Sequence, residues 1–204
     1  MKERGMIFNG EMVRAILDGR KTQTRRPIKW KQTRFTEIGE REDGSKWPWS
    51  EDTEHACDFW HPCPFGTVGD RIWVRETWAR YNIDQNSHDI AYRATTPEDW
   101  PEEGRWRPSI HMPRWASRIL LEITNVRVER LNAISEEDAT AEGVPPAGSL
   151  LPDYPGTFLT PKGDFATAKV AFQRLWESIY GEESWKANSW VWVISFKRVE
   201  GGAA

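Results

Sequence analysis

The stretch that most constrains the fold lies near the start of the chain, where a short amphipathic segment runs directly into a cluster of cations. Between Glu11 and Asp18, apolar residues recur at helical spacing. Asn9 is a typical N-cap, and Gly19 suits the position after a helix, where a positive φ is needed. We therefore predict a helix that begins after Asn9 and ends at Gly19.

The eight residues from Gly19 to Arg26, with the sequence GRKTQTRR, hold two hydroxyls and four cations. Because the helix ends at a fixed residue, the polar segment that follows it starts in a defined direction. This segment can direct Lys21, Thr24 and Arg26 to one place, which indicates a functional site. A straight strand would turn Lys21 and Thr24 to opposite sides. A functional site here therefore needs irregular backbone, and the alternative is a solvated basic loop.

The pattern Gly19-Arg20-Lys21-Thr22-x-Thr24-x-Arg26 resembles the signature of the ASCH domain family, and is most similar to that of the bacterial N4-acetylcytidine amidohydrolases. The chain also resembles longer ASCH-like proteins of bacteriophages and prophages. The resemblance covers residues 8–26, 66–74, 117–143 and 165–196. It implies an α+β fold in which helices flank a small PUA-like β-barrel. We expect one domain over residues 1–204, with insertions at 29–64, 80–116 and 145–163.

In those amidohydrolases, a lysine, a threonine and a glutamate occupy the motif positions of Lys21, Thr24 and Glu142. The resemblance implies that these three are catalytic, with Arg26 orienting the site or binding substrate. Thr24 would attack or polarise the acyl carbonyl, and Lys21 would deprotonate Thr24 or water if burial and nearby arginines lower its pKa. Glu142 would pass a proton to the departing amine or hydrogen-bond the base. The alternative for Glu142 is an exposed glutamate at a helix end.

A strand is predicted from Asp70 to Trp78, and it places Glu76 on an apolar face. A buried carboxylate needs a partner, which Lys21, Arg25 or Arg26 could supply. Glu76 and Arg75 would form a structural ion pair or support the site. The candidate substrate-binding residues are thus Arg25, Arg26, Arg75 and Glu76.

Four possible zinc ligands, His55, Cys57, His61 and Cys63, lie within nine residues. Their spacing matches neither CxxC nor HxxxH, so we expect packing and surface roles for them, and neither a metal nor a cofactor.

Further elements follow from local patterns. A strand is predicted over residues 119–128 with a bulge near Thr124 and Asn125. A short helix capped by Ser135 should run to Glu142 and stop at Gly143. A longer helix is predicted from Asp164 to Tyr180. The last strand, residues 189–199, is apolar on both faces and should be central.

Charge and composition limit the partners. A net charge of -3 argues against a protein that coats nucleic acid nonspecifically, although the cations between Gly19 and Thr36 form a local basic stretch. Between residues 81 and 118, tryptophans interleave with arginines, a pattern that suits either base stacking or cation–π packing. With no signal peptide and no long apolar run, we expect a cytoplasmic protein without a membrane partner.

We therefore expect an amidohydrolase that removes the acyl group from N4-acylcytidine, with a nucleoside or RNA as its substrate. Two alternatives stay open: a noncatalytic module that binds RNA or a modified base, and an ASCH-type ribonuclease. Protein partners are not predicted.

Overall fold

A computed structural model describes residues 1–29, 37–52, 57–80, 89–101 and 104–199. It confirms a mixed α+β protein with several sheets.

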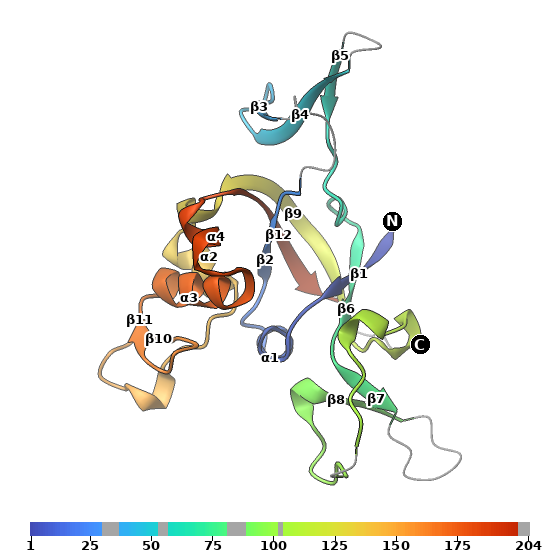
Figure 1. Ribbon diagram of the computed structural model, residues 1–204, viewed down its shortest axis with the longest axis vertical. Helices are drawn as coiled ribbons and strands as arrows, with labels where there is room; N and C mark the ends of the chain where they lie inside the picture. The colour runs from blue at the N-terminus through green and yellow to red at the C-terminus, as the bar shows by residue number, and fades with distance from the viewer. Residues whose placement is uncertain (30–36, 53–56, 81–88, 102–103, 200–204) are drawn as a thin grey trace.

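The central sheet has five strands in the order β1-β6-β9-β12-β2 (Figure 1). The strands are β1 (Glu3–Ile7), β2 (Gln23–Pro27), β6 (Arg71–Arg75), β9 (Leu120–Arg130) and β12 (Trp190–Arg198). Strands β1 and β6 are parallel, and the other neighbours are antiparallel. Strand β12 pairs with β9 and β2, which confirms its predicted central position. Its register shifts from Ser195↔Asn125 to Phe196↔Ile123, which leaves Thr124 as the predicted bulge.

The described strands do not close into a barrel, because β1 and β2 are the two edges of the sheet. A side chain spans the gap between these edges instead. Arg26 Nη2 on β2 donates to Ile7 O on β1 at 2.6 Å, and the Arg26 guanidinium lies 5.2 Å from the centre of the Phe8 ring. We call the space between the edges of β1 and β2 the seam.

Helix α1 (Gly10–Leu17) connects the two edge strands. Its predicted ends are confirmed: Asn9 Oδ1 accepts from Met12 N at 2.9 Å, and Gly19 has φ 75°. Helix α2 (Glu136–Ala141) follows β9, with Ser135 as its N-cap.

Helices α3 (Ala168–Tyr180) and α4 (Glu182–Lys186) precede β12. Helix α3 begins later than predicted, after Thr167. The reason is that β11 (Phe165–Ala166) is extended and pairs with β10 (Phe158–Leu159). Asp164 therefore caps no helix and bonds to Thr160 and Arg174.

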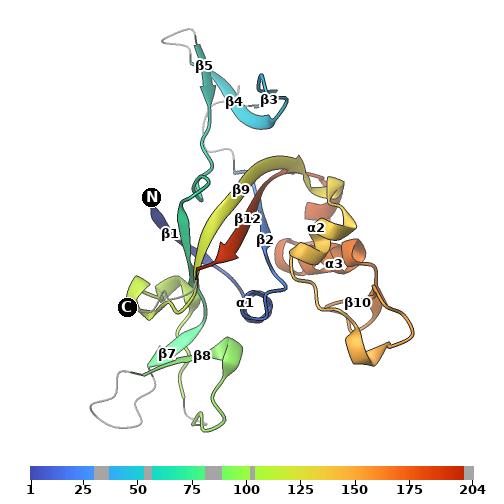
Figure 2. The same ribbon diagram turned by 180° about the vertical axis from the view of Figure 1, so that it is seen from behind.

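Smaller sheets lie at the ends of the central one (Figures 1 and 2). Strands β3 (Glu37–Glu40), β4 (Lys46–Asp52) and β5 (Cys57–Trp60) form one sheet. Strands β7 (Trp78–Arg80) and β8 (Ile90–Tyr92) form another near the opposite end, while α2, α3 and α4 cover one side of the molecule.

The prediction of one continuous strand from Asp70 to Trp78 was wrong. Strand β6 ends at Arg75, and β7 begins at Trp78 and pairs with β8 rather than with the central sheet. At the break, Glu76 N donates to Met112 Sδ at 3.3 Å instead of to a strand.

The central sheet has an apolar core on each face. Trp192 and Ile194 pack into one core with α1, while Val191 and Val193 pack into the other with α2 and α3. This alternation along β12 is the strand period of two residues. Among the described residues, no helix is long and apolar enough to cross a membrane.

Candidate functional site

The turn between α1 and β2 is tied to both neighbouring helices. Lys21 N donates to Ala15 O in α1, and Thr22 N donates to Ala141 O in α2, both at 2.9 Å. The backbone at Lys21 and Thr22 is irregular and becomes a strand only at Gln23, so that Thr24 lies within β2. The turn therefore holds the Lys21 side chain between two elements far apart in sequence.

Lys21 and Glu142 form a buried ion pair. Lys21 Nζ donates to Glu142 Oε2 at 2.8 Å, and also to the carbonyl oxygens of Glu142 at 2.8 Å and Gln23 at 2.7 Å. The side chains of Lys21 and Glu142 are 0% and 3% exposed, so Glu142 is not an exposed helix-end residue. Burial lowers the pKa of Lys21, and the attraction of Glu142 opposes this shift only in part.

Arg25 binds the other oxygen of the same carboxylate. Its Nη1 donates to Glu142 Oε1 at 3.2 Å, and its Nη2 donates to Asp138 Oδ2 at 2.8 Å and to Glu129 Oε2 at 3.1 Å. Arg127 Nη2 donates to the same Asp138 oxygen at 2.6 Å. Glu142 is therefore held from both sides by fixed cations.

Sequence reasoning missed Arg127, Glu129 and Asp138 as parts of this network. The alternation of Arg127 and Glu129 along β9 was the available signal, because residues two apart share one face of a strand.

Thr24 is 1% exposed and lines a small cavity together with Glu142. The cavity measures about 20 Å³, which is room for about one water molecule. Its remaining walls come from α1, β2 and α3: Met12, Arg25, Arg26, Phe172, Leu175, Trp176, Ile179 and Tyr180. Aromatic and aliphatic side chains of α3 thus cover the cavity that Thr24 and Glu142 share.

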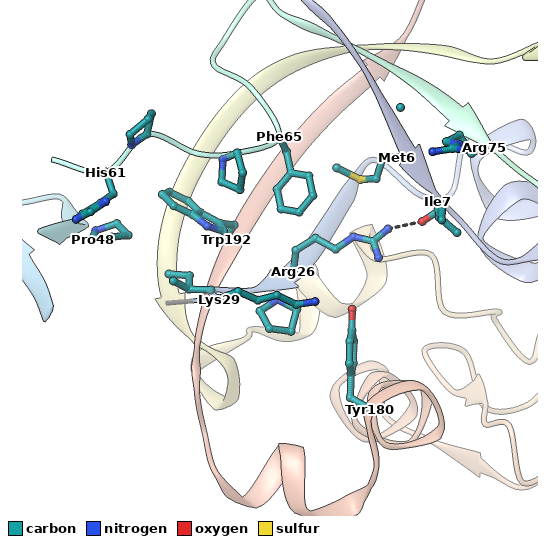
Figure 3. Close-up of a pocket in the computed structure, with 15 residues that line it drawn as sticks. Met6, Ile7, Arg26, Lys29, Pro48, His61, Phe65, Arg75, Tyr180 and Trp192 are labelled. Atoms are coloured by element: carbon teal, nitrogen blue, oxygen red, sulfur yellow. Dashed lines mark hydrogen bonds between the residues drawn. The ribbon is translucent and has the colours of Figure 1, made fainter. Parts of the chain in front are cut away.

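A larger pocket of about 620 Å³ lies in the seam (Figure 3). It contains Arg26, Lys29 and Arg75 among apolar and aromatic side chains, and none of its described lining residues is acidic. The other lining residues are Gly5, Met6, Ile7, Pro27, Ile28, Pro48, His61, Pro62, Pro64, Phe65, Tyr180 and Trp192.

Arg26 and Tyr180 line both cavities. Figure 3 shows the Tyr180 hydroxyl directed toward Arg26. Tyr180 is 39% exposed, and its ring packs against that of Trp176 with the centres 4.5 Å apart. These two side chains form the wall between the cavity at Glu142 and the seam pocket.

Glu76 lies apart from this site, and its expected partners were wrong. Its oxygens accept from Arg118 Nε at 2.9 Å and Nη2 at 3.0 Å, a bidentate pair. Arg75, its neighbour, lines the seam pocket. Its guanidinium donates to Ile110 O and lies 5.3 Å from the centre of the Trp73 ring. The structure thus brings together Lys21, Arg25 and Glu142, with Thr24 and Arg26 beside them.

The four possible zinc ligands do not gather in the described part of the chain. Cys57 is exposed and Cys63 is buried in the core, while His61 Nε2 lies 2.8 Å from Ser50 Oγ. His55 lies outside the described residues. Among those described, no three His, Cys, Asp or Glu side chains are placed to hold a metal ion.

The tryptophan- and arginine-rich segment packs its rings against each other and against cations. Trp100 and Trp106 stack with their centres 4.1 Å apart. Arg118 lies 3.9 Å from the centre of the Tyr92 ring, and Arg107 lies 5.2 Å from that of Trp78. This matches the cation–π alternative, while base stacking stays a prediction.

Comparison with protein-family models, curated proteins and solved structures gives no match.

Proposed function

We propose that the protein is an amidohydrolase that removes the acyl group from N4-acylated cytosine, on a PUA-like scaffold of the ASCH type whose barrel is left open at the seam. One observation supports this most: the buried Glu142 carboxylate, fixed by Lys21 and Arg25, shares a water-sized cavity with Thr24. Amide hydrolysis needs this combination of a water site, a proton carrier and a polar group for the carbonyl oxygen.

The reaction can be written with these residues. Water adds to the acyl carbon while Glu142 takes its proton, and the Thr24 hydroxyl donates a hydrogen bond to the acyl oxygen. The bond from the acyl carbon to N4 then breaks, and Glu142 returns the proton to N4. The products are the free cytosine amine and a carboxylic acid.

Lys21 takes a different part in this scheme from the base that the family resemblance implies. Its Nζ already donates to three acceptors, which uses all three donors of an ammonium. We infer that Lys21 is a positioning residue that orients Glu142 through its hydrogen bonds to the carboxylate and the carbonyl of that residue. Its lowered pKa lets it release a proton more readily than an exposed lysine does.

Substrate must displace part of α3, because a cavity of about 20 Å³ does not hold an acylated base. Tyr180 is the side chain to move, since it is partly exposed and separates the cavity from the seam pocket. With Tyr180 turned aside, the two spaces join into one site.

The test is incubation of the purified protein with N4-acetylcytidine and longer N4-acyl cytidines, following cytidine release by chromatography. Glu142→Gln and Thr24→Val should each lower kcat by at least about a hundredfold, the usual contribution of a proton carrier or carbonyl donor. Thr22→Val is the matched control for Thr24, because Thr22 is exposed. Circular dichroism melts show whether each variant is folded.

Full activity in a folded Glu142→Gln protein would overturn the proposed chemistry. If the wild-type protein binds cytidine derivatives but releases no product, the noncatalytic reader becomes the better account. Cleavage of an RNA strand would favour the ribonuclease.

A further inference from the structure

The seam pocket is lined by positively charged side chains that have no role in the proposed hydrolysis. Arg26, Lys29 and Arg75 line it, and none of the three forms an ion pair with a described residue. Elsewhere, the arginines nearest the site are neutralised, as Arg25 is by Glu142, Asp138 and Glu129. A pocket with several uncompensated cations attracts an anion.

Two of these cations also have unused donors. The Nε atoms of Arg26 and Arg75 are buried and have no hydrogen-bond partner among the described residues. A buried donor without a partner costs stability. The planar guanidinium suits the oxygens of a phosphate.

The rest of the pocket is apolar and aromatic. Trp192, Phe65 and Tyr180 line it together with several prolines, and these surfaces suit a flat ring or the carbon face of a sugar. Its volume of about 620 Å³ falls within the usual range for a small-ligand site. Aromatic walls with cations are the combination that binds nucleotides and single-stranded nucleic acid.

We propose that the seam pocket binds the sugar and phosphate of a cytidine nucleotide, either free or within an RNA strand, so that the substrate is a nucleotide rather than an uncharged nucleoside. The identity of the base rests on the proposed function. The placement follows from the two side chains, Arg26 and Tyr180, that line both cavities. The base would pass Tyr180 to reach Glu142, while the phosphate stays in the seam pocket among its cations.

Calorimetric titration of the full chain with cytidine, cytidine monophosphate, inorganic phosphate and a short cytidine-containing oligoribonucleotide tests this. We expect the monophosphate to bind at least about tenfold tighter than cytidine, the effect of one or two charge-assisted hydrogen bonds. Lys29→Gln and Arg75→Gln should reduce this ratio. Lys29 is exposed, so its replacement leaves the fold intact. Lys197→Gln is the matched control, because Lys197 is exposed on β12 but outside the pocket.

Equal affinity for cytidine and its monophosphate overturns the inference. So does a loss of monophosphate affinity in the Lys197→Gln control that equals the loss in the pocket variants. Binding of inorganic phosphate as tight as that of the nucleotide also overturns it. Tighter binding of the oligoribonucleotide than of the monophosphate identifies RNA as the source, and equal binding identifies the free nucleotide. Both of these support the pocket.

The two proposals fail separately. Turnover of N4-acetylcytidine without any preference for its phosphorylated form overturns the nucleotide inference alone. Phosphate-dependent binding without turnover of any acylated compound overturns the amidohydrolase alone.

Discussion

At the scale of single residues, the Lys21–Glu142 pair belongs to the proposed active site and also affects the stability of the fold. Both side chains are buried, and taking two charges out of water is costly unless each finds partners. Here every donor of Lys21 has an acceptor, and both oxygens of Glu142 have donors. The arrangement stays intact only while all of these members are present.

Lys21→Met should therefore lower the free energy of unfolding by about 3–5 kcal/mol, the cost of leaving one charge of a buried pair behind. Adding Glu142→Gln should restore part of that loss, because the uncompensated carboxylate is then gone. The measurement is chemical denaturation of both single variants and the double variant. Lys197→Met, which removes an exposed partner of Glu122, should cost about 1 kcal/mol or less. Additive effects at Lys21 and Glu142 would contradict the coupling.

The two cysteines should differ sharply in reactivity. Burial raises the pKa of the Cys63 thiol to about 11, whereas Cys57 is exposed. Because the thiolate is the reactive form, iodoacetamide at pH 8 should modify Cys57 in the native protein and Cys63 only after unfolding. Peptide mass spectrometry assigns the sites. Rapid labelling of native Cys63 would contradict its placement in the core.

The same shift predicts how Cys63 contributes to stability as pH changes. In the unfolded chain the thiol has its ordinary pKa of 9.0, while in the folded protein it keeps its proton to higher pH. The contribution of Cys63 is therefore complete below pH 9 and is lost as pH rises toward 11.

At the scale of elements, the site depends on how closely α2 approaches the turn after α1. Gly143, at the end of α2, has φ 87°, and an added Cβ would lie 2.7 Å from Lys21 Cβ and 2.9 Å from Ala15 Cβ. Arg20 Nη1 also donates to Gly143 O at 2.9 Å. Glycine is needed here both for its conformation and for the space.

Gly143→Ala should lower stability by about 1–3 kcal/mol more than Gly19→Ala, because overpacking adds to the strain of a positive φ. Gly19 is the matched control, since it has φ 75° but no atom within 4 Å of an added Cβ. Thermal melts measure the difference, and deacylation by the folded variant reports whether Lys21 has moved. Equal destabilisation by the two substitutions would show that the contact at Gly143 is relaxed.

Much of this element-level structure is predictable from sequence because it is determined locally. The caps at Asn9 and Ser135 and the bulge at Thr124 depend on residues within one turn or one strand, and all three were predicted. Long-range pairs were not. Glu76 pairs with Arg118 and Arg25 with Asp138, and no local pattern selects such a partner from the many available charges.

At the scale of the whole molecule, the curled sheet explains why a pocket and a buried site lie next to each other. Strands β1 and β2 are joined by α1, yet they end up as the two edges of the sheet. The seam between them is spanned by Arg26, and β2 also carries Thr24 and Arg25 at the other cavity. One short strand therefore lines both spaces.

Arg26→Met should loosen the seam without unfolding the sheet. It removes the hydrogen bond to Ile7 O and the contact with Phe8, but every backbone pairing of β2 with β12 remains. Amide hydrogen exchange should therefore accelerate about tenfold or more in β1 and the start of α1, the effect of losing about 1.5–3 kcal/mol of a charged hydrogen bond. Exchange in β9 and β12 should change little. Lys197→Met serves as the control, and unchanged exchange in β1 of the Arg26 variant would mean that contacts other than Arg26 hold the two edges together.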